Sequence, residues 1–370
     1  MIMDISKTNQ KQEAGNNSKQ NQLIGDNSNQ TIIENQTNNV TITGADLPDV
    51  VTLTTIVSTQ VTAQALKLCT QVSENTCRQR IEKFESVFIP RITRLENVVN
   101  ELIDPKFQFM LRDAKISAVK SSRDEDLDML TQLLICHIEK GKDMIVDAGI
   151  NKAIQIVDQV DYDSLCALTC MATIFGVCSG SGNIKEGLQF MDDLFSKLLY
   201  TELPTGDDWI DHLNILGAVV IQTGLFNKFE EIYSRLIDGY VCVGVKKDSE
   251  EHKEVIDIMK SNDIDLKELV ENELLPGYLR LSIAQQASLN TEHKDLMRVF
   301  ELYSKDKELM SISKSKFFEM WNSFPNLKRI KEWYEKIPFF FRITSVGYAL
   351  AQTNAKRCYP KFPDLIGGNE

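Results

Sequence analysis

Apolar residues recur every three or four positions along most of the chain after residue 46. This spacing places apolar side chains on one face of a helix. The connections between such segments, for example SGSGN at 179–183 and LPTGDD at 203–208, are short, which favours antiparallel neighbouring helices. No repeat of fixed length runs through this part of the chain, so the pattern predicts an irregular helical bundle rather than a solenoid.

Long amphipathic helices are expected between residues 47 and 103, and Pro90 is expected to break or kink this run. The acidic stretch RDEDLD at 123–128 is typical of a helix N-terminus, so a further helix is expected to start there. The remaining predicted helices span about residues 163–178, 184–200, 208–222, 227–237, 250–259, 266–274, 293–303 and 328–335.

Composition narrows the class of protein. At 370 residues and 42% hydrophobic content, the chain is long enough for a large helical domain with appendages. A formal net charge of -12 argues against chain-wide affinity for nucleic acid or anionic membranes. The longest apolar run, at 165–178, is shorter than the roughly 20 residues that span a bilayer. The eight cysteines follow no disulfide-framework spacing, and the N-terminus lacks a signal-peptide pattern, so we expect a soluble cytoplasmic protein without membrane segments.

A polar repeat occupies residues 15–44, before the long helical pattern. GNNS at 15–18 and GDNS at 25–28 are each followed by a glutamine and then by an apolar pair, and NVTITG at 39–44 is a looser third copy. Glycine with Asn or Asp tolerates positive φ at turns, whereas apolar β-branched pairs favour strands. The period therefore matches one short strand plus one turn.

Stacked copies of this repeat would form a self-assembly element. Identical Asn and Gln side chains form ladders along a fibre or solenoid axis, and each backbone pairs with the one above. The alternative is a disordered polar leader, because low hydrophobicity and richness in Asn, Gln and Ser are also typical of disorder. The residues expected to carry assembly are Gly15, Asn16, Asn17, Gln20, Gly25, Asn27, Gln30, Ile32 and Ile33.

Two short motifs resemble an uncharacterised bacterial family. KQEAGNNSKQ at 11–20 is similar to the Lys-Gln-Glu-Ala-Gly-Asp/Asn-Asn-Ser opening of that family, whose members continue as a helical domain. DPKFQFML at 104–111 is similar to an Asp-Pro-x-Phe-Gln-aromatic segment within it. The polar repeat also resembles amyloid-type signalling motifs found beside bacterial immune proteins. These resemblances imply a bacterial helical protein and supply no known activity.

An acidic motif is the first candidate for chemistry. Asp207, Asp208 and Asp211 have the Asp-Asp-x-x-Asp spacing by which all-α prenyl-chain enzymes hold magnesium and a diphosphate, since residues three and four apart share a helical face. No second acidic motif of this type accompanies it. The alternative is that these carboxylates stabilise a helix N-terminus.

Two further patterns are weaker candidates. GVCSGSGNIKEG at 176–187 is glycine-rich but lacks the Gly-Lys-Ser/Thr ending of a phosphate loop, so turn glycines are expected. Cys166, Cys170 and Cys178 with His137 include no Cys-x-x-Cys pair, and cysteines inside a Leu/Ala/Met/Ile run are typical of core residues. We therefore expect no metal site and no cofactor.

The C-terminal residues 311–361 are basic, with ten Lys and Arg residues against three Glu residues. FFFRITSVGYALAQTNAKR at 339–357 predicts a strand, a Thr-Ser cap and a helix, and it resembles the strand-to-helix end of winged-helix domains. A basic winged helix can bind DNA in the major groove, whereas the alternative is a module that packs on protein, including the chain's own acidic bundle. The candidate nucleic-acid contacts are Lys328, Arg329, Lys331, Arg342, Lys356 and Arg357.

The sequence thus predicts a mainly α protein in three parts: a polar β-repeat or disordered assembly segment at 1–44, a helical domain at 45–310, and a basic winged-helix-like module with a tail at 311–370. We expect a homo-oligomer without catalytic residues, acting as a scaffold, sensor or adaptor for a protein partner in bacterial antiviral defence or stress signalling. A DNA- or RNA-binding regulator and a metal-dependent diphosphate enzyme are the alternatives.

Overall fold

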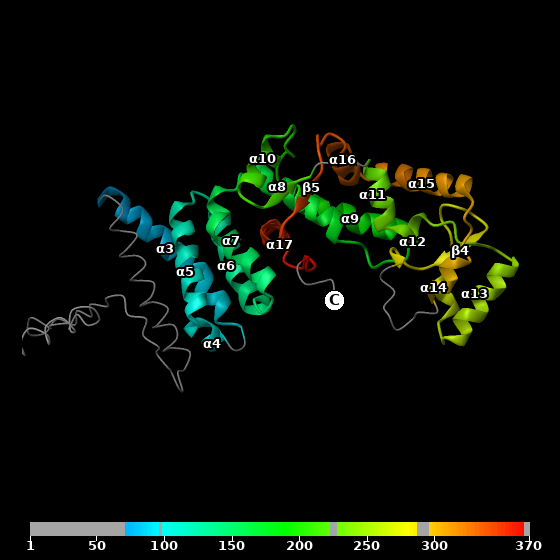
Figure 1. The fold of residues 1–370 in the computed structure, drawn as a ribbon, viewed down its shortest axis with the longest axis horizontal. Helices are drawn as coiled ribbons and strands as arrows, with labels where there is room; N and C mark the ends of the chain where they lie inside the picture. Colours follow the sequence, from blue (N-terminus) through cyan, green and yellow to red (C-terminus); the bar gives the residue numbers. More distant parts are fainter. Residues whose placement is uncertain (1–70, 96–97, 223–227, 287–295, 366–370) are drawn as a thin grey trace, which may run out of the picture. The chain divides into compact units, whose positions relative to one another are not determined.

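The computed structural model describes residues 71–95, 98–222, 228–286 and 296–365 (Figure 1). The chain divides into two compact units, Met1–Asp46 and Leu47–Glu370. The polar repeat at 15–44 lies outside the described residues, and so do all the residues expected to carry assembly. The described part of the second unit is mainly α-helical, as the apolar spacing predicts, and it contains no helix with the length and apolar character needed to cross a membrane.

A helical bundle forms the first part of the described chain. Its helices are α3 (Gln71–Ile92), α4 (Val98–Ile103), α5 (Pro105–Lys120), α6 (Asp124–Lys140), α7 (Met144–Ile156) and α8 (Tyr162–Gly176). Helix α3 packs against α5 and α6, and α6 packs against α7. The C-terminal helix α17 (Ser345–Cys358) packs against α6, α7 and α8, and it lies beside α6 and α7 in Figure 1. A helix from the far end of the sequence therefore completes this bundle.

The local sequence explains where these helices begin and end. Asp104 caps α5, because its carboxylate accepts a hydrogen bond from the backbone N–H of Lys106 at 2.6 Å. Helix α6 starts at Asp124 with three acidic residues in its first turn, which confirms the start predicted from RDEDLD. Helix α3 continues through Pro90 and ends at Ile92, so the helical run stops just after the proline.

An aromatic core holds the central helices together. These helices are α9 (Ile184–Leu198), α11 (Phe229–Leu236), α12 (Asp238–Val241), α15 (Lys307–Asn322) and α16 (Pro325–Tyr334). The ring of Phe229 lies 5.2 to 5.4 Å from the rings of Tyr233, Trp321 and Tyr334. Phe229 and Trp321 are fully buried, so this cluster is part of the apolar core of the central helices.

Helix α16 receives its N-terminal cap from another helix. Its own preceding residue, Phe324, makes no side-chain cap. Instead, Oδ1 of the buried Asp192 on α9 accepts hydrogen bonds from the backbone N–H groups of Asn326 at 2.8 Å and Leu327 at 3.1 Å. This carboxylate satisfies donors that would otherwise be unpaired and fixes the start of α16 against α9.

A small antiparallel sheet lies between α12 and α15 in the sequence. It contains β2 (Val245–Lys246), β3 (Leu269–Glu271) and β4 (Tyr278–Leu281) in the order β2-β4-β3. Its core is shared with α13 (Glu250–Ser261) and α14 (Leu296–Glu301) and contains Val245, Val255, Met259, Leu281, Val299 and Tyr303.

The helix predicted at 266–274 is wrong. This segment forms a single 3-10 turn, η3 (Leu266–Glu268), and then strand β3. Leu269 and Val270 of β3 pair with Leu281 and Arg280 of β4. Pairing with a partner strand therefore outweighs a local apolar spacing that is compatible with a helix.

The predicted helix at 208–222 is shorter than expected. Helix α10 (Asp208–Ile215) stops before Gly217, whose φ of 75° turns the chain into β1 (Val219–Ile221). Strand β1 pairs antiparallel with β5 (Phe341–Ile343). The glycine therefore separates a helix and a strand within one apolar run.

Strand β5 and helix α17 confirm the strand, cap and helix predicted at 339–357. Thr344 caps α17, and its hydroxyl accepts a hydrogen bond from the backbone N–H of Gly347 at 3.2 Å. The partner of β5 is β1, which comes from the middle of the chain. Residues 311–365 therefore lie in the same compact unit as the helical bundle.

Candidate functional site

The cations predicted to contact nucleic acid are mostly engaged by the chain's own acceptors. On α16, Lys331 pairs with Glu230 at 2.5 Å and Arg329 pairs with Glu202 at 3.0 Å. At the end of α17, Lys356 pairs with Asp364 at 2.7 Å. These contacts join the basic C-terminal elements to acidic residues elsewhere in the unit.

The remaining predicted cations differ in exposure. Arg357 is half-buried, donates to Oδ1 of Asn354 at 2.9 Å and lies 5.0 Å from the ring centre of Tyr200. Lys328 is exposed and lies 3.8 Å from Glu332, one turn along α16. Arg342 is exposed on β5. The six cations are therefore spread over α16, β5 and α17, and five of them have an acceptor within the chain.

The acidic motif lies at the N-terminus of α10. Asp207 is the residue before the helix, and Asp208 and Asp211 lie in its first turn, all exposed to solvent. Carboxylates in this position stabilise the helix through its dipole. Among the residues that the structure describes, no group of three or more His, Cys, Asp or Glu side chains is arranged to hold a metal ion.

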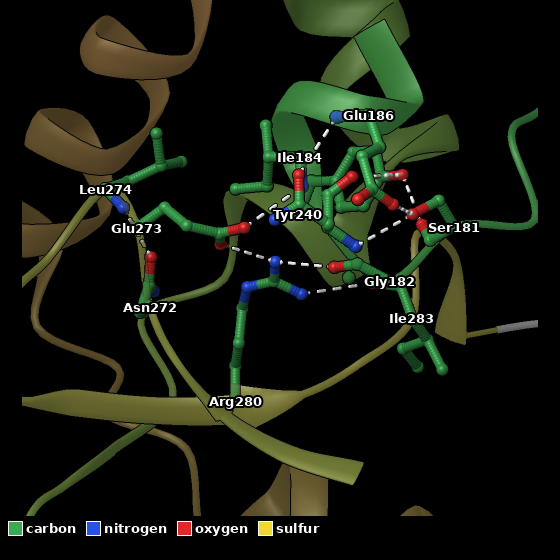
Figure 2. Close-up of polar contacts among 12 residues, drawn as sticks. Ser181, Gly182, Ile184, Glu186, Tyr240, Asn272, Glu273, Leu274, Arg280 and Ile283 are labelled. Carbon is green, nitrogen blue, oxygen red and sulfur yellow. Dashed lines mark hydrogen bonds and ion pairs between the residues drawn. The ribbon is translucent and has the colours of Figure 1, made fainter. Parts of the chain in front are cut away.

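The glycine-rich loop at 178–183 leads into α9 and is held by a buried arginine (Figure 2). Arg280 on β4 is completely buried and donates from Nη2 to the carbonyl of Gly182 at 2.8 Å and to Oε2 of Glu273 at 2.7 Å. Oε1 of Glu273 accepts a hydrogen bond from the backbone N–H of Ile184 at 3.1 Å. A carboxylate of the chain itself therefore occupies the α9 N-terminus, where a phosphate loop would bind its ligand.

Close backbone contact explains one glycine of this loop. A Cβ atom on Gly182 would overlap the backbone carbonyl and hydroxyl of Ser282. Gly180, in contrast, has open space around the position of a Cβ atom. Arg280 also lies over the ring of Tyr240, whose hydroxyl donates to the carbonyl of Ser181. The close approach of Ser282 therefore accounts for the glycine at 182, whereas the open space and the ordinary φ at 180 impose no such requirement.

The cysteines and the histidine considered as metal ligands do not gather into one metal site within the described ranges. Cys166 and Cys170 are buried in α8, and the Cys166 thiol donates to the carbonyl of Leu198 at 3.3 Å. His137 on α6 instead pairs through Nδ1 with Oδ1 of Asp147 at 2.5 Å. Burial raises the pKa of the Cys170 thiol, which keeps it protonated near neutral pH. No disulfide joins cysteines within the described ranges.

An aromatic cleft, which the sequence did not single out, lies between the loop before α10 and the end of α16. Its walls include Pro204, Trp209, Trp333 and Ile337, with Lys336 beside them, and it is too narrow to hold a water molecule. The indole rings of Trp209 and Trp333 lie 5.7 Å apart at 38°. The only sequence signal is that two of the three tryptophans in the chain form this one site.

The two indoles of the aromatic cleft differ in their hydrogen bonds. Nε1 of Trp333 donates to the carbonyl of Pro204 at 2.9 Å. Nε1 of Trp209 is buried and has no acceptor among the described residues. An unpaired buried N–H is costly to stability.

Comparisons with known proteins give a family and no activity. A protein-family model described only as ":-like" matches residues 51–366. Searches of the curated proteins and of the solved structures give no significant match. The matched family region starts close to the boundary between the two units and runs almost to the C-terminus. Because the match covers most of its length, the chain belongs to this family.

Proposed function

We propose that the protein is a non-catalytic, oligomerising scaffold or adaptor, in which residues 15–44 template assembly and the family region binds a protein partner. The observation that carries this proposal is the division of the chain: the unit boundary follows Asp46, and the family match begins at residue 51. The Asn/Gln repeat thus precedes the family region in the sequence. A segment that stacks with its copies would bring the attached family regions together.

Protein binding, rather than nucleic-acid binding, is supported by the surface of the family region. Five of the six candidate cations already have an acceptor within the chain, which reduces the positive charge that these six offer to phosphates. Apolar side chains are exposed instead on neighbouring α5 and α7, where Phe109, Met144 and Ile145 are 57%, 84% and 74% exposed. Exposed apolar residues of this kind are typical of protein contacts.

The biological setting belongs to the same proposal. The resemblance of the repeat to amyloid-type signalling motifs, and of residues 11–20 to a bacterial family, supports a role in antiviral defence or stress signalling. Free thiols in the described part are consistent with a reducing compartment, so we place the protein in the cytoplasm.

Truncation tests the assembly role directly. Light scattering should be measured at several concentrations on the full-length chain and on a chain beginning at Ala45, with circular dichroism as the control for folding. We expect a large or discrete oligomer only for the full-length chain. The circular dichroism spectra should show that the helical region is folded equally in both chains. Equal particle mass for the two folded chains would exclude the repeat as an assembly element.

A further inference from the structure

We propose that the site filled by residues 362–365 of the chain is a peptide-binding site, which a partner protein takes over with a segment of the pattern Phe-Pro-Asp-Leu. This inference rests on the proposed adaptor function and specifies the chemistry of its partner. Residues 359–365 follow α17 and, apart from a turn at 360–361, form neither helix nor strand. They contact four residues from three helices, which we call the tail site: Lys140 on α6, Gly176 at the end of α8, and Gln352 and Lys356 on α17.

Gln352 holds the backbone of this segment with both ends of its side-chain amide. The residue is only 3% exposed. Its Nε2 donates to the carbonyl of Pro363 at 3.3 Å, and its Oε1 accepts a hydrogen bond from the backbone N–H of Leu365. Main-chain hydrogen bonds of this kind hold a peptide without depending on its side chains, so the side-chain contacts around them decide which peptide fits.

Two lysines bind the aspartate of the segment. Nζ of Lys140 lies 2.8 Å from one carboxylate oxygen of Asp364, and Nζ of Lys356 lies 2.7 Å from the other. The two lysines belong to different helices, α6 and α17, so they converge on this carboxylate only in the folded unit. A partner segment therefore needs an acidic residue at this position.

The neighbours of this aspartate set the apolar part of the pattern. Phe362 is buried. Leu365 packs against Gly176, where a Cβ atom would lie only 2.5 Å from Cδ2 of the leucine. Pro363 offers its carbonyl to Gln352, a contact that requires no N–H from the proline. An aromatic residue, a proline, an acidic residue and a leucine in this order therefore match the tail site.

The segment is held by contacts that another peptide can replace. The side chain of Asp364 is 45% exposed and those of Lys140 and Lys356 are 23% exposed, so each ion pair contributes little. Because the segment belongs to the same chain, it competes at an effective concentration that is roughly millimolar for a short connection. A partner displaces it only when the partner makes further contacts beside the tail site, which makes the site selective.

A labelled peptide tests the site on the full-length chain. The variant Asp364→Lys should release the chain's own segment, because Lys140 and Lys356 repel a third cation, while the tail site itself is unchanged. Hydrogen exchange with mass spectrometry should show faster exchange at 359–365, with the circular dichroism spectrum retained. The peptide Tyr-Pro-Lys-Phe-Pro-Asp-Leu, carrying fluorescein at its N-terminus, should then give a saturable rise in fluorescence anisotropy. The original chain should bind it about tenfold more weakly, because its own segment fills the site.

Matched controls identify the contacts. Lys361 is exposed, so Lys361→Glu changes the charge of the segment and should leave it in place, with peptide binding as weak as in the original chain. A peptide with lysine in place of aspartate should not bind Asp364→Lys. Adding Gly176→Ala to that variant should weaken the peptide about tenfold by overlap with its leucine, but should leave a peptide with alanine in place of leucine unaffected.

Several results would overturn the proposal. These are a segment that stays protected in Asp364→Lys, the absence of saturable binding, equal binding of the lysine peptide, and equal losses for the leucine and alanine peptides in Gly176→Ala. A dimer of the original chain that Asp364→Lys abolishes would assign the site to the segment of a second copy, and it would overturn the partner role as well.

The test also separates this proposal from the assembly claim. All four residues of the tail site lie in the second unit, so peptide binding does not depend on the repeat. Saturable peptide binding without repeat-dependent assembly would leave the tail-site proposal intact and remove the assembly role. Assembly without peptide binding would do the reverse.

Discussion

Arg280 is completely buried, and its guanidinium donates to the carboxylate of Glu273 at 2.7 Å while the other oxygen of that carboxylate accepts the backbone N–H of Ile184. This relationship joins β4, the segment after β3 and the start of α9 through one ion pair (Figure 2). The glycine-rich loop is therefore a packed connection between parts of the family region, and its stability can be tested directly.

Removal of the Glu273 carboxylate should destabilise the family region. Glu273→Ala leaves a buried guanidinium without its carboxylate, which costs about 3–5 kcal/mol for a completely buried pair. Because the Glu273 side chain is 30% exposed, we expect about 2–3 kcal/mol of unfolding free energy to be lost. Urea unfolding followed by circular dichroism measures the loss. Glu271→Ala, at an exposed position of β3, is the control, and equal curves for the two variants would contradict the account.

The glycine at 182 should be far less replaceable than the glycine at 180. Gly182→Ala places a methyl group on the backbone of Ser282, and overpacking of this kind typically costs about 1–3 kcal/mol. Gly180→Ala meets open space and should change stability little. Thermal unfolding of the two single variants makes the comparison within one loop. A Tm for Gly182→Ala equal to that of Gly180→Ala would show that the close contact with Ser282 does not exist in solution.

Asp192 should stabilise α16 from α9. Asp192→Ala removes the acceptor for two backbone N–H groups, at Asn326 and Leu327, and should lower the unfolding free energy by about 1–2 kcal/mol. The neighbouring Asp193 is exposed, so Asp193→Ala is a matched control that should stay close to the original stability. Chemical unfolding provides both values. The cap would be refuted if Asp193→Ala lost as much stability as Asp192→Ala.

Much of the fold follows from the sequence because its signals are local. The acidic run before α6 and the Thr-Ser cap before α17 each satisfy helix N-terminal groups within a few residues, so their positions were predictable. Strand β3 could not be predicted in this way, because it depends on pairing with β4, which is distant from the local pattern. The early end of α10 could not be predicted either, because it depends on the positive φ of Gly217 and not on the apolar spacing. Helix α15 was also missed, since its polar N-terminal half weakens the apolar spacing.

The candidate sites also divide into those with a local sequence signal and those that depend on the tertiary fold. The acidic motif at α10 could be interpreted from sequence, because a helix N-terminus attracts carboxylates wherever it occurs. The aromatic cleft could not, because Trp209 and Trp333 are far apart in the chain and meet only after α10 and α16 are in place. The engagement of Lys331 by Glu230 likewise depends on the tertiary fold.

The tail after α17 should show a pH-dependent contribution to stability. Partial burial acts to raise the pKa of Asp364, but hydrogen bonds and charges from Lys140 and Lys356, at 2.8 and 2.7 Å, hold it below its ordinary value of 3.8. A lowered folded-state pKa gives stability that is present above the unfolded value and is lost as the pH falls through the folded value. Because Asp364 is partly exposed, the contribution should be less than about 1 kcal/mol.

The variant Asp364→Asn tests the direction of this pH dependence. The variant should be slightly less stable than the original chain at pH 7, and the difference should shrink as the pH falls below 3.8. Urea unfolding at a series of pH values gives the difference. A gap between the two proteins that widened on acidification would contradict the assigned ion pairs.

The most direct test of the assembly claim is sedimentation velocity on two full-length chains of identical composition. In one chain residues 15–44 keep their order, and in the other the same residues are shuffled so that the Gly-Asn/Asp-Asn-Ser spacing is lost. The account predicts a concentration-dependent oligomer for the original order and a monomer for the shuffled one, since side-chain ladders require register. Identical sedimentation distributions would contradict it, because the order of residues 15–44 would then have no effect on assembly.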